Sequence, residues 1–138
     1  MTALDASAAA KLVVAERGSV QMRALFRSDD EFFSSSILVA ELLRLATRIG
    51  ADYGTVERLL ARMELLAVDD SILREAGRLN LPGTWVNSSD AIYLVTAQRL
   101  QQRTLLTYDQ QQARAAYALG ITPLAPGSEE DWWRRSHR

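Results

Sequence analysis

The 138-residue sequence contains no cysteine, and its single histidine, His137, is the penultimate residue. Without cysteine the chain forms no disulfide, no thiolate metal site and no thiol nucleophile, which suits a reducing cytosol. One histidine at the very end of the chain argues against a Ser-His-Asp triad and against a histidine-built zinc site. Any metal would therefore have to be bound by oxygen ligands.

Lysine is also scarce, because Lys11 is the only one and the other cations are arginines. Arginine suits phosphate contacts, although a GC-rich genome also favours this composition. The formal net charge is −1, so the overall field does not attract nucleic acid, and any RNA affinity depends on a local patch. Candidate contributors to such a patch are Arg23, Arg27, Arg44 and Arg48.

Long apolar runs are missing too, since none approaches the ~20 residues of a membrane span. The start "MTALDASAAAKLVVAE" has no basic segment and carries an early acid, which argues against a secretory signal. We expect a cytoplasmic protein with no membrane partner. The length and the 48% apolar content predict one folded domain over residues 1–138.

Short apolar segments alternate with helical patterns along the chain. We expect strands at 2–5, 31–36, 65–68, 104–108 and 121–126, and helices at 8–16, 20–26, 38–49, 56–63, 72–79, 90–101 and 110–119. This alternation predicts an α/β fold, a three-layer α/β/α arrangement with a central parallel sheet of about four to five short strands. In such sheets the functional site lies beyond the carboxyl ends of the strands.

Individual residues mark several boundaries. Gly18 is expected to end the first helix, and the serines at 34–36 are natural N-caps for the next long helix. Segment 80–89 is a loop by its Pro-Gly and Asn-Ser content. Pro123 places the last strand at an edge of the sheet. The helix at 90–101 is apolar nearly all round in its first half, which predicts deep packing.

Four acidic residues are predicted to meet in one cleft. Asp5 and Asp109 end the first and fourth strands. Glu41 lies roughly 60° from the buried stripe of its helix, and Asp90 shares a helical face with inward-facing apolar residues. Close carboxylates repel one another unless some bind protons or a cation neutralises them. With oxygen ligands alone, Mg²⁺ or Mn²⁺ is favoured, and such ions support phosphoryl chemistry.

Each acid also has an ordinary structural interpretation. Asp5 could end its strand in a turn, and Asp109 could cap helix 110–119. Asp90 follows two serines and could face the helix dipole. Glu41 could pair with Arg44 on its own helix. Four such residues at one edge of the sheet nevertheless favour a metal site.

Four blocks carry a resemblance to a known family: "LDASAAAKLVVAE", "SSSILVAELLRLA", "SSDAIYLVTAQRL" and "LLTYDQQQARAAYALGI". In this order and at these separations they resemble the PIN domain, and within it the VapC-type toxin of bacterial VapBC toxin–antitoxin pairs. The resemblance extends from about residue 3 to residue 126.

The resemblance implies a metal-dependent endoribonuclease. Its catalytic, metal-binding acids correspond to Asp5, Glu41, Asp90 and Asp109, with Mg²⁺ as cofactor and Mn²⁺ as a substitute. Ser7 matches a small hydroxyl residue expected to orient a ligand or water, and Thr107 is assigned a similar part with less support. Lys11 and Arg44 are candidate RNA contacts, although Lys11 could equally be a solvated helix lysine.

The family also implies partners. Its members cut structured RNA, often transfer RNA or ribosomal RNA, and arrest translation. They usually form homodimers, and a cognate VapB-like antitoxin silences them, in heterotetramers or larger assemblies. The alternatives are a housekeeping PIN nuclease in RNA maturation and an inactive PIN module that only binds. A small antitoxin gene directly upstream would favour the toxin.

Two positions depart from the family pattern. Tyr93 stands where many relatives carry histidine, and "TWVNSS" before Asp90 lacks the expected basic residue. Two other classes fit worse. A haloacid-dehalogenase-type phosphatase needs a second Asp where Ser7 stands, and a receiver domain needs an acidic pair and a late lysine. Trp132 and Trp133 could form a dimer or antitoxin contact, but an anchor onto the core is favoured.

Overall fold

The computed structural model describes residues 2–28 and 31–135; His137 lies outside this part. Five parallel strands form one sheet in the order β3-β2-β1-β4-β5. Their bounds are β1 Thr2–Leu4, β2 Phe32–Ser35, β3 Glu64–Leu66, β4 Thr104–Leu106 and β5 Thr122–Leu124. The helices are α1 Ala6–Ala10, α2 Ser19–Phe26, α3 Ile37–Ile49, α4 Tyr53–Ala61, α5 Asp70–Gly77, α6 Ser88–Arg99 and α7 Gln110–Ala118, followed by a 3₁₀ helix, η1, at Trp132–Arg134. The predicted α/β class and strand number are confirmed.

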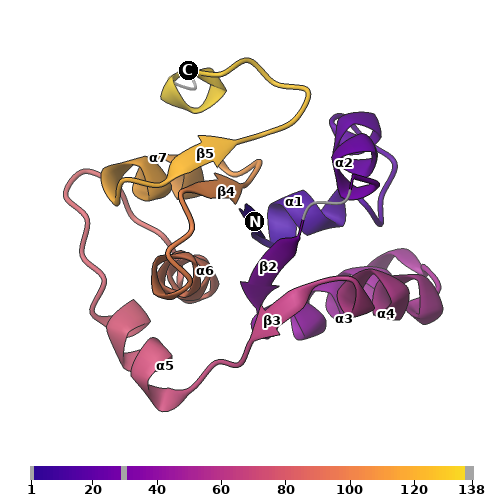
Figure 1. The fold of residues 1–138 in the computed structure, drawn as a ribbon, viewed down its shortest axis with the longest axis horizontal. Helices are drawn as coiled ribbons and strands as arrows, with labels where there is room; N and C mark the ends of the chain where they lie inside the picture. Colours follow the sequence, from indigo (N-terminus) through magenta and orange to yellow (C-terminus); the bar gives the residue numbers. More distant parts are fainter. Residues whose placement is uncertain (1, 29–30, 136–138) are drawn as a thin grey trace.

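Helices cover both faces of the sheet, as Figure 1 shows. Neighbouring residues of a strand point to opposite faces, so Leu4 and Leu106 pack against α1–α4, whereas Ala3 and Leu105 pack against α6 and α7. A third cluster joins α5 to α6. Helix α6 therefore has buried residues on most of its sides, and the predicted deep packing of this segment is confirmed.

Two predicted boundaries are wrong. The first helix is α1, which covers residues 6–10 rather than 8–16, because the Asp5 side chain caps it from directly after β1. Gly18 does not end that helix: it has a φ of 90° and precedes α2. The Ser36 side chain makes no capping bond to α3, since its oxygen accepts a hydrogen bond from the Val68 amide.

The remaining segments agree more closely with the sequence. β5 is an edge strand and contains Pro123. Helix α6 begins at Ser88, two residues before the expected start, because Asn87 caps it. Trp133 is buried, and its ring lies 4.9 Å from that of Tyr117 on α7. This packing confirms the anchor interpretation for Trp133. Among the described helices, none is long and apolar enough to cross a membrane.

Candidate active site

The strand order reverses between β1 and β4, the two central neighbours from which the chain proceeds to opposite edges of the sheet. Parallel sheets open a crevice at this switch point, beyond the carboxyl ends of the strands. Asp5 directly follows β1, and Asp109 lies three residues after β4. The fold therefore delivers two of the four predicted acids to the crevice from its two central strands.

The Asp5 carboxylate is buried and held from both sides. Its Oδ1 accepts hydrogen bonds from the Ser7 hydroxyl at 2.6 Å and from the Ala8 amide at 3.1 Å. Its Oδ2 accepts from the Thr107 hydroxyl at 2.6 Å. Burial raises the pKa of Asp5 to about 6, an effect opposed by these three hydrogen bonds and reinforced by the charge of Asp109. The structure thus supports the predicted orienting contacts of both hydroxyl residues.

Ser7 connects the two strand ends directly. Its hydroxyl oxygen accepts a hydrogen bond from the Tyr108 amide at 2.9 Å and lies 3.2 Å from the Thr107 hydroxyl. The segment after β1 is therefore tied to the segment after β4. These bonds hold the acids in a fixed relation, which a preorganised site needs.

Asp109 both caps a helix and contributes charge to the crevice. Its Oδ1 accepts a hydrogen bond from the Gln112 amide at 3.0 Å, and its own amide donates to Thr107 Oγ1 at 3.2 Å. Its charge raises the pKa values of Asp5 and Asp90. The capping interpretation is therefore confirmed, and it coexists with a place in the acidic cluster.

Asp90 lies in the first turn of α6, where Asn87 rather than Asp90 caps the helix. Partial burial is the largest cause that raises the pKa of Asp90 to about 7, and the charges of Asp109, Asp5 and Glu41 contribute the rest, in that order of importance. The charges of Asp109, Asp5 and Glu41 therefore all act on Asp90. At neutral pH Asp90 is only partly ionised unless a cation is nearby.

Glu41 and Tyr93 present buried oxygens to each other between α3 and α6. Neither Glu41 Oε1 nor the Tyr93 hydroxyl has a hydrogen-bond partner among the described residues. Burial and the neighbouring Glu41 carboxylate raise the pKa of Tyr93 well above its usual range. The alternative surface pair with Arg44 is not formed, because Glu41 makes no ion pair in the part of the chain described here.

The two predicted RNA contacts line two different hollows. Arg44 is exposed and lines a hollow of about 570 Å³ on α3 together with Glu41 and Arg48. Lys11 follows α1; its Nζ is 3.1 Å from Glu16 Oε1 and 4.7 Å from the ring centroid of Tyr108. Lys11 is therefore a half-buried, paired lysine rather than a freely solvated one.

Gln112 is a site residue that the sequence analysis missed. It is fully buried on α7, and its side-chain amide donates a hydrogen bond at 3.0 Å to the backbone carbonyl of Asp90. Its backbone amide also donates the hydrogen bond by which Asp109 caps α7. The sequence feature that could have identified Gln112 is its position three residues after Asp109, where one glutamine of a run of three faces inward.

The donor chemistry of the cluster fits a hard divalent cation. All four groups are carboxylates, and Glu41 Oε1 is buried without a partner among the described residues. Asp90 also carries the raised pKa expected of an acid among uncompensated charges. Within residues 2–28 and 31–135, no three or more Asp, Glu or His side chains form a group that could hold a metal ion. The metal assignment therefore rests on charge and donor type.

This chain belongs to the PIN-domain family, whose sequence pattern matches residues 2–117. It is similar to Ribonuclease VapC46 of Mycobacterium tuberculosis strain H37Rv, with 39% identity over 126 residues, or 89% of this chain and 95% of that protein. The fold also matches the crystal structure of Mycobacterium tuberculosis VapC20, described as a Sarcin-Ricin loop cleaving toxin. That match has a TM-score of 0.74 and 16% identity, and it covers 91% of this chain and 100% of the other. The resemblance seen in the sequence is confirmed.

Proposed function

We propose that this protein is a VapC-type endoribonuclease toxin that depends on Mg²⁺, with Mn²⁺ as a substitute. The observation that supports the proposal is the position of Asp5 directly after β1 and of Asp109 three residues after β4, at the switch point of the sheet. The 39% identical relative is named as a ribonuclease. The PIN domain that matches residues 2–117 would carry this activity.

Asp5, Glu41, Asp90 and Asp109 would hold the cation. When bound, a divalent cation would stabilise charge on a phosphate and favour ionisation of an attacking water. Asp5 is the most rigidly placed ligand because Ser7, Ala8 and Thr107 hold both of its oxygens. Hydrolysis would leave a 5′-phosphate and a 3′-hydroxyl on the cut RNA.

Arg44 is placed to contact phosphates, since it is exposed and lies one helical turn from Glu41. The substrate would be a structured RNA of the transfer or ribosomal class, cut in the cytoplasm with arrest of translation. A VapB-like antitoxin would silence the enzyme, and the active toxin would be a homodimer that joins the antitoxin in a heterotetramer or larger assembly. These statements extend the family resemblance to this chain.

Induced expression in a bacterial host tests the toxin assignment, with wild type beside Asp5→Asn. Asparagine is as good an N-cap as aspartate, so the variant keeps the cap of α1 and loses the charge and one of the two acceptor oxygens. We expect growth arrest by the wild type alone, with relief on co-expression of a cognate VapB-like antitoxin. Arrest by both proteins would contradict the role of Asp5, and arrest by neither would favour a housekeeping PIN nuclease or an inactive binding module.

A further inference from the structure

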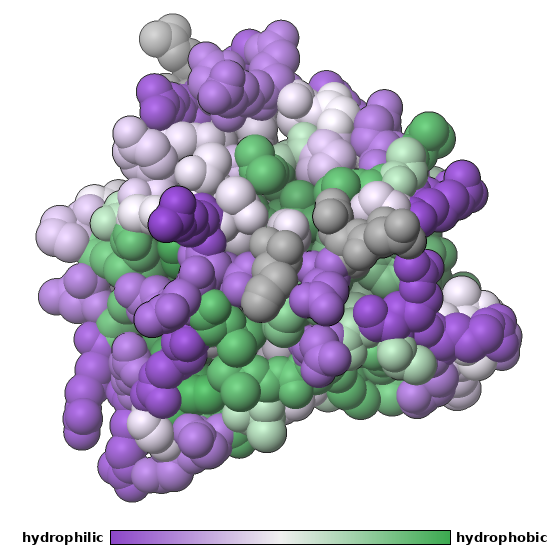
Figure 2. All heavy atoms as spheres, in the orientation of Figure 1, coloured by the Kyte–Doolittle hydropathy of each residue, from purple (hydrophilic) through white to green (hydrophobic). Residues whose placement is uncertain are grey.

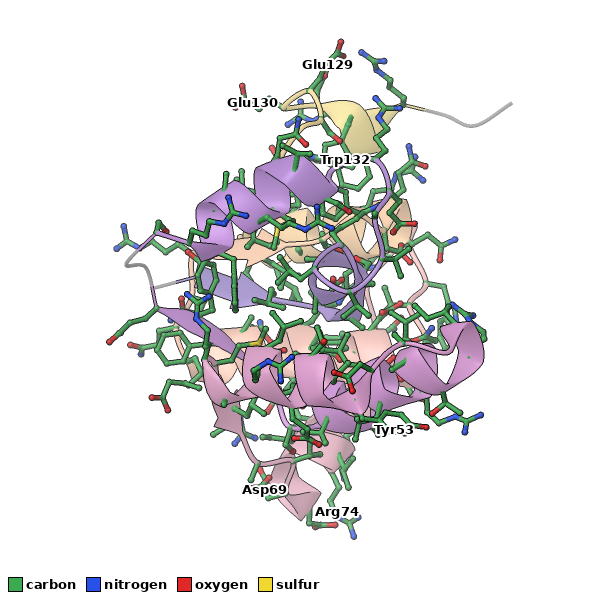
Figure 3. The ribbon with its side chains drawn as sticks, turned by 90° about the vertical axis from the view of Figure 1, so that its right-hand side faces the viewer. Tyr53, Asp69, Arg74, Glu129, Glu130 and Trp132 are labelled. Atoms are coloured by element: carbon green, nitrogen blue, oxygen red, sulfur yellow. The ribbon has the colours of Figure 1, made fainter. Side chains whose placement is uncertain are left out.

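A cavity of about 800 Å³ is lined by residues next to Asp109 in the chain and by none of the four acids. Its walls come from the turn after α1, the residue before Asp109, the start of α7 and the C-terminal segment. The lining side chains that matter here are Lys11, Arg17, Tyr108, Gln110, Trp132 and Arg135. In Figure 3 Trp132 lies at the end of the molecule opposite Asp69 and Arg74.

The walls of this cavity are fixed by contacts. The Tyr108 hydroxyl donates to the Pro126 carbonyl at 2.7 Å, and a Cβ at Gly18 would come within 2.8 Å of the Tyr108 ring. The side-chain amide of Gln110 donates to the Arg135 backbone carbonyl at 2.9 Å. The C-terminal segment is therefore held over the start of α7, and the hollow between them is part of the fold.

The charge of the cavity differs in sign from that of the whole chain. Three lining residues are cations and one, Glu129, is an acid, whereas the formal net charge of the protein is −1. Arg135 pairs with Glu129 and Lys11 pairs with Glu16. Arg17 is exposed and makes no ion pair with any described residue, so it is the cation available to a ligand.

The cavity also offers groups that recognise a flat heterocycle. Two aromatic rings line it, and the indole Nε1 of Trp132 is buried without a hydrogen-bond acceptor among the described residues. Aromatic walls combined with arginine are the usual means of binding an unpaired nucleotide. An acidic peptide would match the cations but would leave the aromatic surface and the indole donor unused.

Tyr108, which lines the cavity, also connects it to two of the four acids. This residue directly precedes Asp109, and its amide is bound to Ser7, which in turn holds Asp5. A single RNA strand whose phosphate reached the acids would pass its neighbouring nucleotide into this space. We propose that the cavity is a subsite for one unpaired nucleotide flanking the cut bond, with its phosphate on Arg17 and its base against Tyr108 and Trp132. The proposal rests on the ribonuclease function above.

The test measures binding of a labelled short single-stranded RNA over a salt series, in an Asp90→Asn background so that the RNA stays intact. Removing one phosphate contact lowers the slope of log affinity against log salt by ~0.7 for single strands. We expect Arg17→Ala to weaken binding several-fold and to lower the slope by about that amount. Arg74→Ala is the matched control, because this exposed arginine of α5 lies at the opposite end of the molecule (Figure 3).

Two-dimensional ¹H–¹⁵N spectra report on the base directly. The three tryptophans give three indole signals, and Trp132→Phe assigns one of them. We expect RNA to shift the Trp132 signal most. Equal affinity and slope for Arg17→Ala and Arg74→Ala, with an unmoved Trp132 signal, would overturn the subsite. The subsite would also be overturned if a polyglutamate peptide displaced the RNA while the Trp132 signal stayed unchanged. That result would assign the cations of the cavity to an acidic protein partner.

RNA cleavage by the chain with Asp90 intact separates the two proposals. If the wild type cuts RNA while Arg17→Ala behaves like Arg74→Ala, the subsite is wrong and the ribonuclease function stands. If the wild type cuts no RNA, the proposed function fails and the subsite fails with it.

Discussion

Replacing Asp90 by asparagine is expected to stabilise the metal-free protein while abolishing cleavage. The pKa of Asp90 is raised from 3.8 to about 7 by burial and by the charges of Asp109, Asp5 and Glu41. One pKa unit corresponds to ~1.4 kcal/mol, so ionised Asp90 destabilises the fold by at most about 4 kcal/mol. Because Asp90 is partly exposed, solvent screening lowers the expected gain to about 1–2 kcal/mol.

The sign of this effect depends on pH. A carboxyl with a raised pKa in the folded state binds more protons when folded than when unfolded, so its contribution to stability falls as pH rises from about 4 to about 7. Above pH 7 the folded protein carries the full unfavourable charge. The gain from Asp90→Asn should therefore be largest near pH 8 and mostly vanish near pH 5, where Asp90 is already protonated in the folded protein.

The assay is urea unfolding in excess chelator at pH 5 and pH 8, with circular dichroism as the signal. Asp70→Asn is the control, since Asp70 is an exposed acid in the first turn of α5, paired with Arg74. It should change stability by only a few tenths of a kcal/mol at either pH. An equal gain at both pH values, or a loss of stability at pH 8, would refute the electrostatic reasoning. Added Mn²⁺ should make the wild type more stable than Asp90→Asn, because it stabilises the wild type more than the variant.

Three further substitutions test separate parts of the site and fold. Thr107→Val removes a hydroxyl that favours ionised Asp5. The pKa of Asp5 should therefore rise further, and stability at pH 8 should fall by ~1–3 kcal/mol. Carboxyl ¹³C titration measures the pKa and urea unfolding measures the stability; an unchanged pKa would contradict the assignment. Tyr93→Phe removes a buried hydroxyl next to the Glu41 carboxylate. Mn²⁺ should then bind several-fold more weakly, as measured by calorimetry, and Tyr93→His should restore the affinity. Equal affinity in Tyr93→Phe would show that Tyr93 contributes only packing. Trp133→Ala deletes a buried anchor and should cost ~3 kcal/mol in thermal unfolding, whereas a loss below ~1 kcal/mol would show that the C-terminal segment is dispensable.

Most of the fold followed from the sequence because its strands and helices have clear periods. The apolar pairs Ala3–Leu4 and Leu105–Leu106 marked strands buried on both faces, and the structure places each pair as expected. The first helix was misjudged because a side-chain cap decides its start. Residues 8–16 look helical, but the Asp5 cap starts the helix at Ala6, and the segment after Ala10 turns towards α2. Hydropathy alone does not report such a contact.

The polar surroundings of the site were harder to predict than its acids. Surface hydropathy does not single out the crevice: in Figure 2 polar and apolar residues are interspersed over the visible face. The four carboxylates were predicted from strand ends and helix faces, which follow from periodicity, and from the resemblance to the PIN domain. The buried amide of Gln112 and the facing oxygens of Tyr93 and Glu41 depend on how α3, α6 and α7 approach one another. Distances between helices are set by packing across the whole sheet.

The central claim is that the four carboxylates form the metal-dependent centre of a ribonuclease. The most direct measurement is cleavage of total transfer and ribosomal RNA by the purified protein, with Mn²⁺ or with chelator, for wild type and for Asp109→Asn. Asparagine keeps the cap of α7, so the variant differs mainly in charge. The account predicts cuts ending in 5′-phosphates for the wild type with Mn²⁺ only, and a loss of at least about 100-fold in the variant, as for removal of a key charged group. Equal cleavage by the variant, or undiminished cleavage in chelator, would contradict it.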